Sequence, residues 1–366
     1  MINKYKKIVI KIGSSSIVNP KTKKINVKWM KKICEDIKKY HKEKNIIIVC
    51  SGAIALGSPL IKGQSLRKLE DKQAAASIGQ IELAHQWKQH LKINKINIAQ
   101  ILITLEDSEV RRRYLNARKT INTLIQNKVI PVINENDTVA TEEIRYGDND
   151  RLAARVAQMI DADLLILFSD VDGLYEQNPN KYKDAKKINE IYKINKKIEQ
   201  MANSQTSSLG SGGMITKIEA AKICMNNGCD TILTHYEKKH PLSSISKSNS
   251  SIFFANKKPS SSRKQWLLNH LHSSGFIKID EGALKAIKNN KSLLPAGILE
   301  VGGNFYRGDV ISVFFKKKEK IAIGVSAYDI NEAKKIIGKK SKEIPKILGY
   351  EGRDEIIHKD DLVKII

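Results

Sequence analysis

The chain has little of what several common protein classes require. It holds only four cysteines, with no CxxC pair and no histidine at metal-ligand spacing, which argues against a disulfide framework and a zinc site. No apolar run reaches the roughly 18 residues that a transmembrane helix needs. The amino terminus passes from a short apolar segment directly into Gly13, which indicates a first strand and not a signal peptide. We therefore expect a cytoplasmic protein without a membrane segment.

Two common catalytic patterns are also missing. The glycine cluster 210–213 is not followed by Gly-Lys-Ser/Thr at Walker spacing, and it does not fit GxGxxG. None of the eight histidines falls in the polar loops described below, which argues against histidine-based hydrolysis.

The chain is strongly basic, with a formal net charge of +25 from 64 Lys and Arg against 39 Asp and Glu. Such a charge can indicate a nucleic-acid partner. The lysines are nevertheless spread along the whole chain, together with an excess of Ile and Asn, as a genome biased toward A and T would impose. We favour the compositional explanation, although the charge would still help to attract an anionic substrate.

The first 260 residues alternate between strand and helix patterns. With 366 residues and 41% hydrophobic content, the chain can bury a sizeable core and should divide into two domains. The alternation predicts an α/β domain over 1–260, an open, mostly parallel sheet sandwiched by helices. We expect strands over 7–12, 45–50, 96–103, 128–133 and 163–168, a final strand over 230–233, and helices over 27–41, 73–91, 110–126, 151–160 and 218–227.

A change in amino-acid composition and in hydrophobic pattern marks a second domain. Residues 243–262 are rich in Ser, Lys and Asn, and we expect a linker at about 256–275. Beyond it, Gly-punctuated apolar runs predict a small β-rich domain over 275–366. Its expected strands lie at 275–280, 296–302, 309–315 and 321–326, with one helix near 330–337.

The segment 132–151, VINENDTVATEEIRYGDNDR, holds more small polar and acidic groups than a core or a solvated face needs. It lies between an apolar strand pattern and a helix pattern, and ligands bind outside the carboxyl ends of strands in open α/β sheets. Helix caps and Asx turns would explain some of these residues but not all of them. We therefore predict a binding loop. Pro131 is in tension with this assignment, because proline is disfavoured in a central strand.

Two lysines suggest an anion site. Lys11 lies inside an otherwise apolar strand, where a charge is costly without a partner. Lys217 follows a glycine cluster at a helix start, where backbone N–H groups and the helix dipole favour an anion. Phosphoryl transfer needs such charge stabilisation together with in-line positioning. The two lysines could flank a transferring phosphoryl group, with Asp150 holding both ammonium groups.

At these residues the chain resembles the glutamate 5-kinases, of the amino acid kinase superfamily. The resemblance covers essentially the whole chain, through motifs that occur in the family's order: 49–55 VCSGAIA, 114–118 YLNAR, 131–137 PVINEND, 147–150 GDND, 210–217 GSGGMITK and 292–297 SLLPAG.

The resemblance implies ATP-dependent phosphorylation of the side-chain carboxylate of L-glutamate, the first step of proline biosynthesis. Lys11, Lys217 and Asp150 would be catalytic, and Ser51, Asp137 and Asn149 would bind glutamate, with Asp137 pairing the α-ammonium group. Mg²⁺ would bridge the phosphates of ATP. The family also implies feedback inhibition by proline and a homo-oligomer, a dimer or a tetramer. The expected ATP-binding residues are Lys11, Ser169, Asp170, Ser211, Gly212, Gly213, Met214, Ile215, Thr216 and Lys217.

Departures from the family pattern are mild. Ser169 and Ser211 stand where threonine is common, and both keep the hydroxyl. The second domain resembles a PUA module, a kind often found in RNA-modifying enzymes, but the resemblance does not establish its role here.

Alternative functions remain open. Aspartate kinases and carbamate kinases would use the same lysine pair, but the first loop, Lys11-Ile-Gly-Ser14, and the β-rich tail disfavour both. From another class, the chain could bind RNA through its PUA-like domain; a salt-dependent RNA affinity that survives deletion of residues 1–260, without ATP turnover by the intact chain, would support that hypothesis. A degenerate kinase kept as a sensor is disfavoured, because competent residues occupy every catalytic position.

Overall fold

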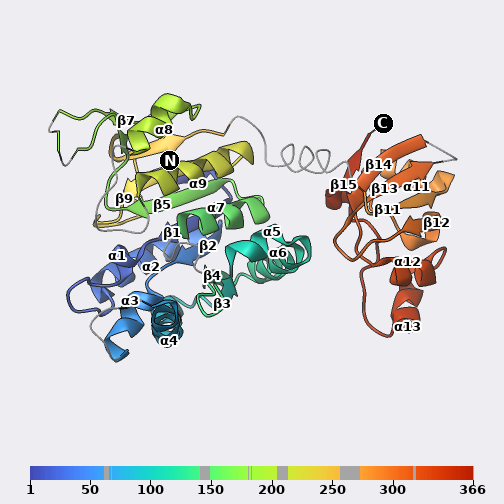
Figure 1. Ribbon diagram of the computed structural model, residues 1–366, viewed down its shortest axis with the longest axis horizontal. Helices are drawn as coiled ribbons and strands as arrows, with labels where there is room; N and C mark the ends of the chain where they lie inside the picture. The colour runs from blue at the N-terminus through green and yellow to red at the C-terminus, as the bar shows by residue number, and fades with distance from the viewer. Residues whose placement is uncertain are drawn as a thin grey trace. The chain divides into compact units, whose positions relative to one another are not determined.

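The computed structural model describes residues 1–61, 66, 68–140, 149–179, 181–182, 184–203, 213–255, 273–315 and 319–365. The chain divides into two compact units, Met1–Pro259 and Ser260–Ile366 (Figure 1). Within these residues, no helix is both long enough and apolar enough to cross a membrane.

The first unit is built on an eight-stranded sheet in the order β3-β4-β2-β1-β5-β9-β10-β8. Every neighbouring pair is parallel except β9 and β10, which confirms the predicted mostly parallel α/β sheet. Its strands are β1 (Lys7–Ile12), β2 (Asn45–Cys50), β3 (Ile98–Ile103), β4 (Ile130–Glu135), β5 (Leu164–Ser169), β8 (Glu190–Ile191), β9 (Asp230–His235) and β10 (Ser250–Phe253), and a separate hairpin pairs β6 (Leu174–Tyr175) with β7 (Lys187–Ile188).

Helices cover both faces of this sheet (Figure 1). Alternate residues of β1 point to opposite faces, so Ile8 and Ile10 enter the core beneath α2 and α4, while Val9 enters the core beneath α7 and α9. The helices are α1 (Ser14–Ile17), α2 (Val27–His41), α3 (Ala53–Gly57), α4 (Leu69–Ile93), α5 (Leu105–Glu109), α6 (Arg111–Gln126), α7 (Asn149–Met159), α8 (Lys196–Asn203) and α9 (Met214–Asn226).

Pro131 is accommodated by where β4 is paired. The backbone N–H of Ile130 donates to Asn97 O on the β3 side, so the nitrogen of the next residue, Pro131, faces β2. The register between β4 and β2 begins only at Val132. The donor that proline lacks is therefore not needed, and the predicted strand stands despite its proline.

Two sequence predictions for this unit were wrong. Strand β9 is not the final strand, because β10 follows it antiparallel within the stretch 243–262, rich in Ser, Lys and Asn, where we expected no strand. Helix α9 begins at Met214 and not near Ile218, because the chain is already helical directly after Gly213. Lys217 therefore lies within the first turns of the helix.

The second unit is a five-stranded sheet in the order β12-β11-β13-β14-β15, with its own hydrophobic core around Ile277, Phe305 and Tyr328. The β-rich prediction is confirmed, but two of its helices and its last strand were not expected. Its elements are β11 (Gly275–Ile279), α11 (Glu281–Lys288), β12 (Ile298–Gly303), β13 (Val310–Phe315), β14 (Glu319–Val325), α12 (Ile330–Ile336), α13 (Ile344–Leu348) and β15 (Leu362–Lys364).

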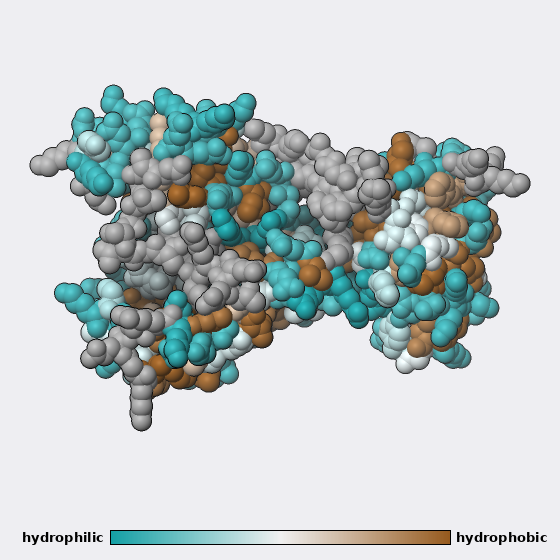
Figure 2. Space-filling view, in the orientation of Figure 1, coloured by the Kyte–Doolittle hydropathy of each residue, from teal (hydrophilic) through white to brown (hydrophobic). Residues whose placement is uncertain are grey.

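Hydrophilic residues cover most of the visible surface of both units, with interspersed hydrophobic areas (Figure 2).

Candidate active site

Three charged side chains from distant parts of the sequence meet in the first unit. Lys11 Nζ lies 2.6 Å from Asp150 Oδ1, and Lys217 Nζ lies 3.2 Å from Asp150 Oδ2. The Asp150 side chain is only 1% exposed, and each lysine side chain is 8% exposed. The structure thus brings together the three residues that the sequence suggested as catalytic.

Each member of this cluster is placed by a different element. Lys11 lies near the carboxyl end of β1, where its backbone pairs with Val49 of β2 and Leu167 of β5. Asp150 lies in the first turn of α7, and Lys217 lies near the start of α9, which packs against α7. The site therefore sits where α/β sheets bind their ligands, at the carboxyl ends of the central strands.

Burial alone would raise the pKa of the Asp150 carboxyl. The ammonium groups of Lys11 and Lys217, with a hydrogen bond from Thr216, outweigh burial and hold that pKa well below its usual range. Asp150 therefore stays ionised and keeps both lysines pointed into the same small volume.

The start of α9 contributes further groups to this volume. Thr216 Oγ1 lies 3.0 Å from Asp150 Oδ2 and 2.9 Å from Gly213 O, which ties the glycine turn to the cluster. Met214 is buried and Ile215 is partly buried against the core. Ser211 and Gly212, also expected to bind the nucleotide, lie outside the described residues.

A cavity of about 440 Å³ adjoins the cluster. Ser51, Asp137 and Asn149, the three residues expected to bind the acceptor, all line it. Asn149 precedes Asp150, and its amide nitrogen donates to Cys50 O at 2.6 Å and to Asn134 Oδ1 at 2.9 Å. These bonds fix the Asn149 side chain between the ends of β2 and β4.

Two polar groups in this cavity have unmet bonding capacity. Ser51 Oγ is buried and has no hydrogen-bond partner in the described part of the chain. Burial raises the pKa of the Asp137 carboxyl to about 6, as expected for a carboxylate that no cation of the described residues compensates. A ligand with a hydrogen-bonding oxygen and an ammonium group would satisfy both residues.

The end of β5 lies beside the end of β1, where Lys11 pairs with Leu167. Ser169 Oγ donates to Asp170 Oδ1 at 2.9 Å, and the backbone N–H of Tyr236 donates to Ser169 O at 3.0 Å. Ser169 is buried and Asp170 is exposed. The hydroxyl–carboxylate pair expected to hold the nucleotide is thus formed at a strand end.

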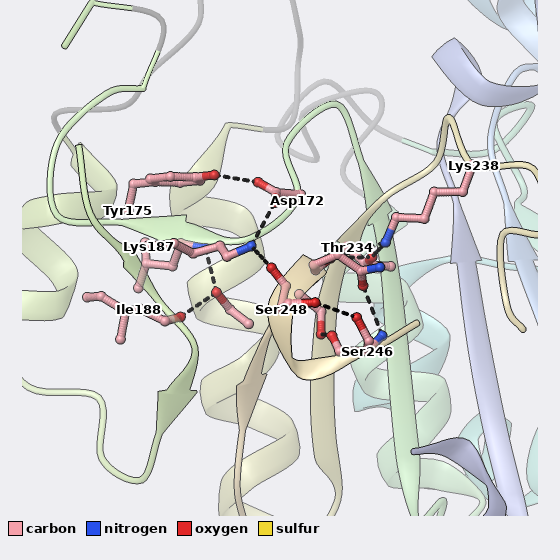
Figure 3. Close-up of polar contacts among 12 residues, drawn as sticks. Asp172, Tyr175, Lys187, Ile188, Thr234, Lys238, Ser246 and Ser248 are labelled. Carbon is pink, nitrogen blue, oxygen red and sulfur yellow. Dashed lines mark hydrogen bonds and ion pairs between the residues drawn. The ribbon is translucent and has the colours of Figure 1, made fainter. Parts of the chain in front are cut away.

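Asp172, two residues further on, belongs to a structural network (Figure 3). It accepts hydrogen bonds from Tyr175 Oη at 2.6 Å and from Lys187 Nζ at 2.7 Å, and Lys187 also donates to Ser248 O at 2.5 Å. These bonds fasten the β6–β7 hairpin to the segment before β10. Asp172 is therefore explained by packing, and Asp170 is the acidic residue of this turn that faces solvent.

Sequence reasoning missed the contribution of α4 to the cavity. Lys72 lines the cavity, Gln73 Nε2 donates to Ala140 O at 3.1 Å, and Gln80 Oε1 accepts from Asn134 Nδ2 at 2.6 Å. Gln73 and Gln80 are seven residues apart, which places them on one face of a helix. Polar residues at that spacing beside a buried alanine-rich face were the available signal.

The family comparison agrees with this architecture. Residues 6–235 match the model of the amino acid kinase family, and residues 275–348 match the PUA domain. The chain belongs to the amino acid kinase family.

Within this family, the relatives that resemble the chain over nearly its whole length are glutamate 5-kinases. The glutamate 5-kinase of Paramagnetospirillum magneticum is 48% identical over 98% of this chain and 97% of its own length. That of Agrobacterium fabrum is 49% identical over 98% of this chain and 93% of its own, and that of Sinorhizobium fredii is 47% identical over 99% and 93%. The similarity thus spans both units.

Proposed function

We propose that this chain transfers the γ-phosphoryl group of ATP to the side-chain carboxylate of L-glutamate, giving L-glutamyl 5-phosphate in the first step of proline biosynthesis. The observation that carries the proposal is the buried Lys11–Asp150–Lys217 cluster beside a cavity fitted to an amino acid. The glutamate 5-kinases that match nearly the whole chain support it.

The cluster suits the charge that develops during phosphoryl transfer. Negative charge spreads over the oxygens of the migrating group, and two fixed ammonium groups stabilise it without reorganising at the moment of reaction. Asp150 holds the lysines in place, and the phosphoryl oxygens would take over part of that pairing. The protein then contributes positioning and electrostatics, with no covalent intermediate on the chain.

The nucleotide would lie between the start of α9 and the end of β5. The first backbone N–H groups of α9 and Lys217 would receive phosphate oxygens, and Ser169 and Asp170 would hold the rest of the nucleotide. In the described residues no three His, Cys, Asp or Glu side chains gather as a metal cage. Mg²⁺ would be held mainly by the phosphates of ATP, where it would neutralise part of their charge.

Glutamate would occupy the 440 Å³ cavity. Asp137 would pair the α-ammonium group, Ser51 would donate a hydrogen bond to the carboxylate that attacks, and Asn149 would line the pocket beside them. This orientation predicts that N-acetylglutamate, which has no ammonium group, is a poor substrate.

The direct test is ATP-dependent and glutamate-dependent formation of an acyl phosphate, trapped with hydroxylamine as the hydroxamate. We expect hydroxamate with L-glutamate, and far less with L-aspartate or N-acetylglutamate at equal concentration. Equal product with N-acetylglutamate, or ADP release that ignores the acceptor, would contradict the proposal.

Proline is proposed as the feedback inhibitor at the glutamate cavity. It offers the same α-carboxylate and a charged amine to Asp137 but has no side-chain carboxylate to phosphorylate. Inhibition that raises the KM for glutamate without changing kcat would support this assignment, and proline-insensitive turnover would refute it.

We also propose a homo-oligomer, a dimer or a tetramer, that forms through the edge of the sheet. Strand β3 is an edge strand, and neighbouring α4 exposes Ile81, whose surface is 76% accessible. Unpaired edges and exposed isoleucines are features that proteins usually cover. Light scattering on the wild-type chain and on Ile81→Glu tests the surface, because the charge should shift the mass toward the monomer.

The cytoplasm is the proposed location. All four cysteines are buried and unpaired, as a reducing compartment would keep them.

A further inference from the structure

The proposed substrate brings three charged groups into the cavity, and the inference that follows rests on that proposed function. The side-chain carboxylate must face Lys11 and Lys217, and the ammonium group pairs with Asp137. The α-carboxylate remains, and burying it requires a cation or several hydrogen-bond donors of its own.

Among the described residues, the cavity lining offers two lysines, Lys23 and Lys72. Lys23 is exposed and lies in the tight turn between Val18 and Ile25, with a φ of 55°. Lys72 is half-buried in the first turns of α4. A half-buried ammonium group on a long helix is the better placed of the two, because less side-chain freedom is lost when it binds an anion.

Helix α4 is held in place by contacts of the residues that follow Lys72. Gln73, the next residue, bonds Ala140 O, and Gln80 bonds Asn134, which also lines the cavity. At Gly79, α4 also contacts α3 so closely that an added Cβ would lie 1.9 Å from Ala53 O. Lys72 therefore projects from a fixed backbone whose neighbours are residues of the acceptor cavity.

The charges of the described lining also favour a lysine beside the substrate. Glu135 and Asp137 are the acidic residues of the cavity, and without lysine they would repel a substrate that carries two carboxylates. We infer that Lys72 binds the α-carboxylate of the amino acid and so selects substrates with a negative charge at that carbon.

This role predicts discrimination against L-isoglutamine, in which the α-carboxylate is replaced by a neutral amide of nearly the same shape while the side-chain carboxylate is kept. In the wild type, glutamate should be preferred. In Lys72→Gln the preference should collapse, because glutamate loses its cation while isoglutamine loses little.

The experiment measures kcat/KM for glutamate in both proteins, and the inhibition of glutamate turnover by isoglutamine, so that a poor substrate still reports its affinity. We expect Lys72→Gln to lower kcat/KM for glutamate by about 10- to 100-fold, the usual size of a charge-assisted hydrogen bond. The inhibition constant of isoglutamine should change by less than about 3-fold, because its neutral amide would lose only a weak hydrogen bond.

Three further measurements separate binding from structural damage. The KM for ATP should be unchanged in Lys72→Gln, Lys72→Arg should recover part of the glutamate affinity, and Lys88→Gln, at an exposed lysine further along α4, should behave as the wild type. Equal losses for glutamate and isoglutamine, or a parallel rise in the KM for ATP, would overturn the inference. A large effect from Lys23→Gln with none from Lys72→Gln would overturn it as well.

Failure of the proposed function would look different. In that case the wild-type chain would form no hydroxamate with glutamate at all, whereas in every outcome that overturns the inference the wild type still forms it.

Discussion

Lys11 Nζ and Asp150 Oδ1 form an ion pair of 2.6 Å between side chains that are 8% and 1% exposed. Removing one partner of a buried ion pair leaves an uncompensated charge in the protein interior. Variants of these residues can therefore be tested for both the stability of the fold and the rate of turnover.

Asp150→Asn should lower both the stability of the fold and the rate of turnover. The two buried lysines would lose their common partner, and the free energy of unfolding should fall by about 3 to 5 kcal/mol. Turnover should fall with it, because the ammonium groups would no longer converge. Thermal unfolding and initial rates measure the two effects.

The matched control is Asp161→Asn, which breaks the ion pair with Arg118, a pair 33% exposed on its acidic side and remote from the cavity residues. A partly exposed pair of this kind contributes about 1 kcal/mol or less. If both variants lost stability and turnover alike, the special role given to Asp150 would be wrong.

Lys217→Ala should lower kcat by about 10³-fold, since it removes a charge that acts mainly on the transition state. The KM for glutamate should change little. The control is Lys222→Ala on the same helix, whose exposed ion pair with Glu199 lies away from Asp150. Normal turnover by Lys217→Ala would remove the basis of the phosphate assignment.

Asp137 gives the enzyme a pH dependence in weak acid. Burial raises the pKa of this carboxyl to about 6, so below that pH the free protein holds it neutral, unable to pair an ammonium group. We expect kcat/KM for glutamate to fall about tenfold per pH unit below pH 6. In Asp137→Asn this slope should vanish, at a lower overall rate.

The carboxyls of Asp150 and Asp137 make the stability of the fold depend on pH in opposite directions. The folded-state pKa of Asp150 lies below its ordinary 3.8, so its stabilisation is present above that value and is lost as pH falls below it. The folded-state pKa of Asp137 lies above its ordinary 3.8, so its contribution is greatest below that value and is lost as pH rises through about 6. Unfolding of Asp137→Asn between pH 4 and 7 should accordingly lack one pH-dependent component that the wild type shows.

Gly79→Ala should destabilise the first unit, although alanine is the better helix former by about 1 kcal/mol. The new Cβ would lie 1.9 Å from Ala53 O, so α3 and α4 would have to separate. Because Ser51 and Gly52 lead into α3, glutamate affinity should fall with the melting temperature.

Gly282→Ala in α11 is the control for that prediction. There the nearest atom, Asp280 Oδ1, lies 3.4 Å from the added Cβ, so the helix preference of alanine should prevail. An unchanged or raised melting temperature for Gly79→Ala would show that the α3–α4 contact can adjust.

Strong periodicity made much of the fold predictable. The apolar runs of β1, β2 and β5 and the helical pattern of α2 are decided locally, and the structure has them within a residue or so of the expected bounds. Strand β10 was missed because its short sequence, Ser250-Ser251-Ile-Phe253, does not by itself predict a strand. It is extended because it pairs with β9. Helix α9 was placed too late because Gly213 caps it without a side-chain signal.

The cavity was harder to predict than the charged cluster. A lysine inside an apolar strand points to a partner from the sequence alone, and Lys11 was singled out for that reason. Lys72 looks like any of the many solvated lysines until α4 is docked against α3, a long-range packing that no local pattern encodes. The roles of the cavity residues remain predictions for the measurements above.

The burial of Lys11 and Lys217 has a consequence for how this protein tolerates sequence drift. Charges removed from water are screened little by salt, whereas those on the surface are screened within about 8 Å at physiological ionic strength. Turnover at saturating substrate should therefore be nearly indifferent to moderate salt and to the number of lysines outside the cluster. Basic residues can therefore accumulate on the surface of such a protein in the course of evolution without a change in its catalytic rate.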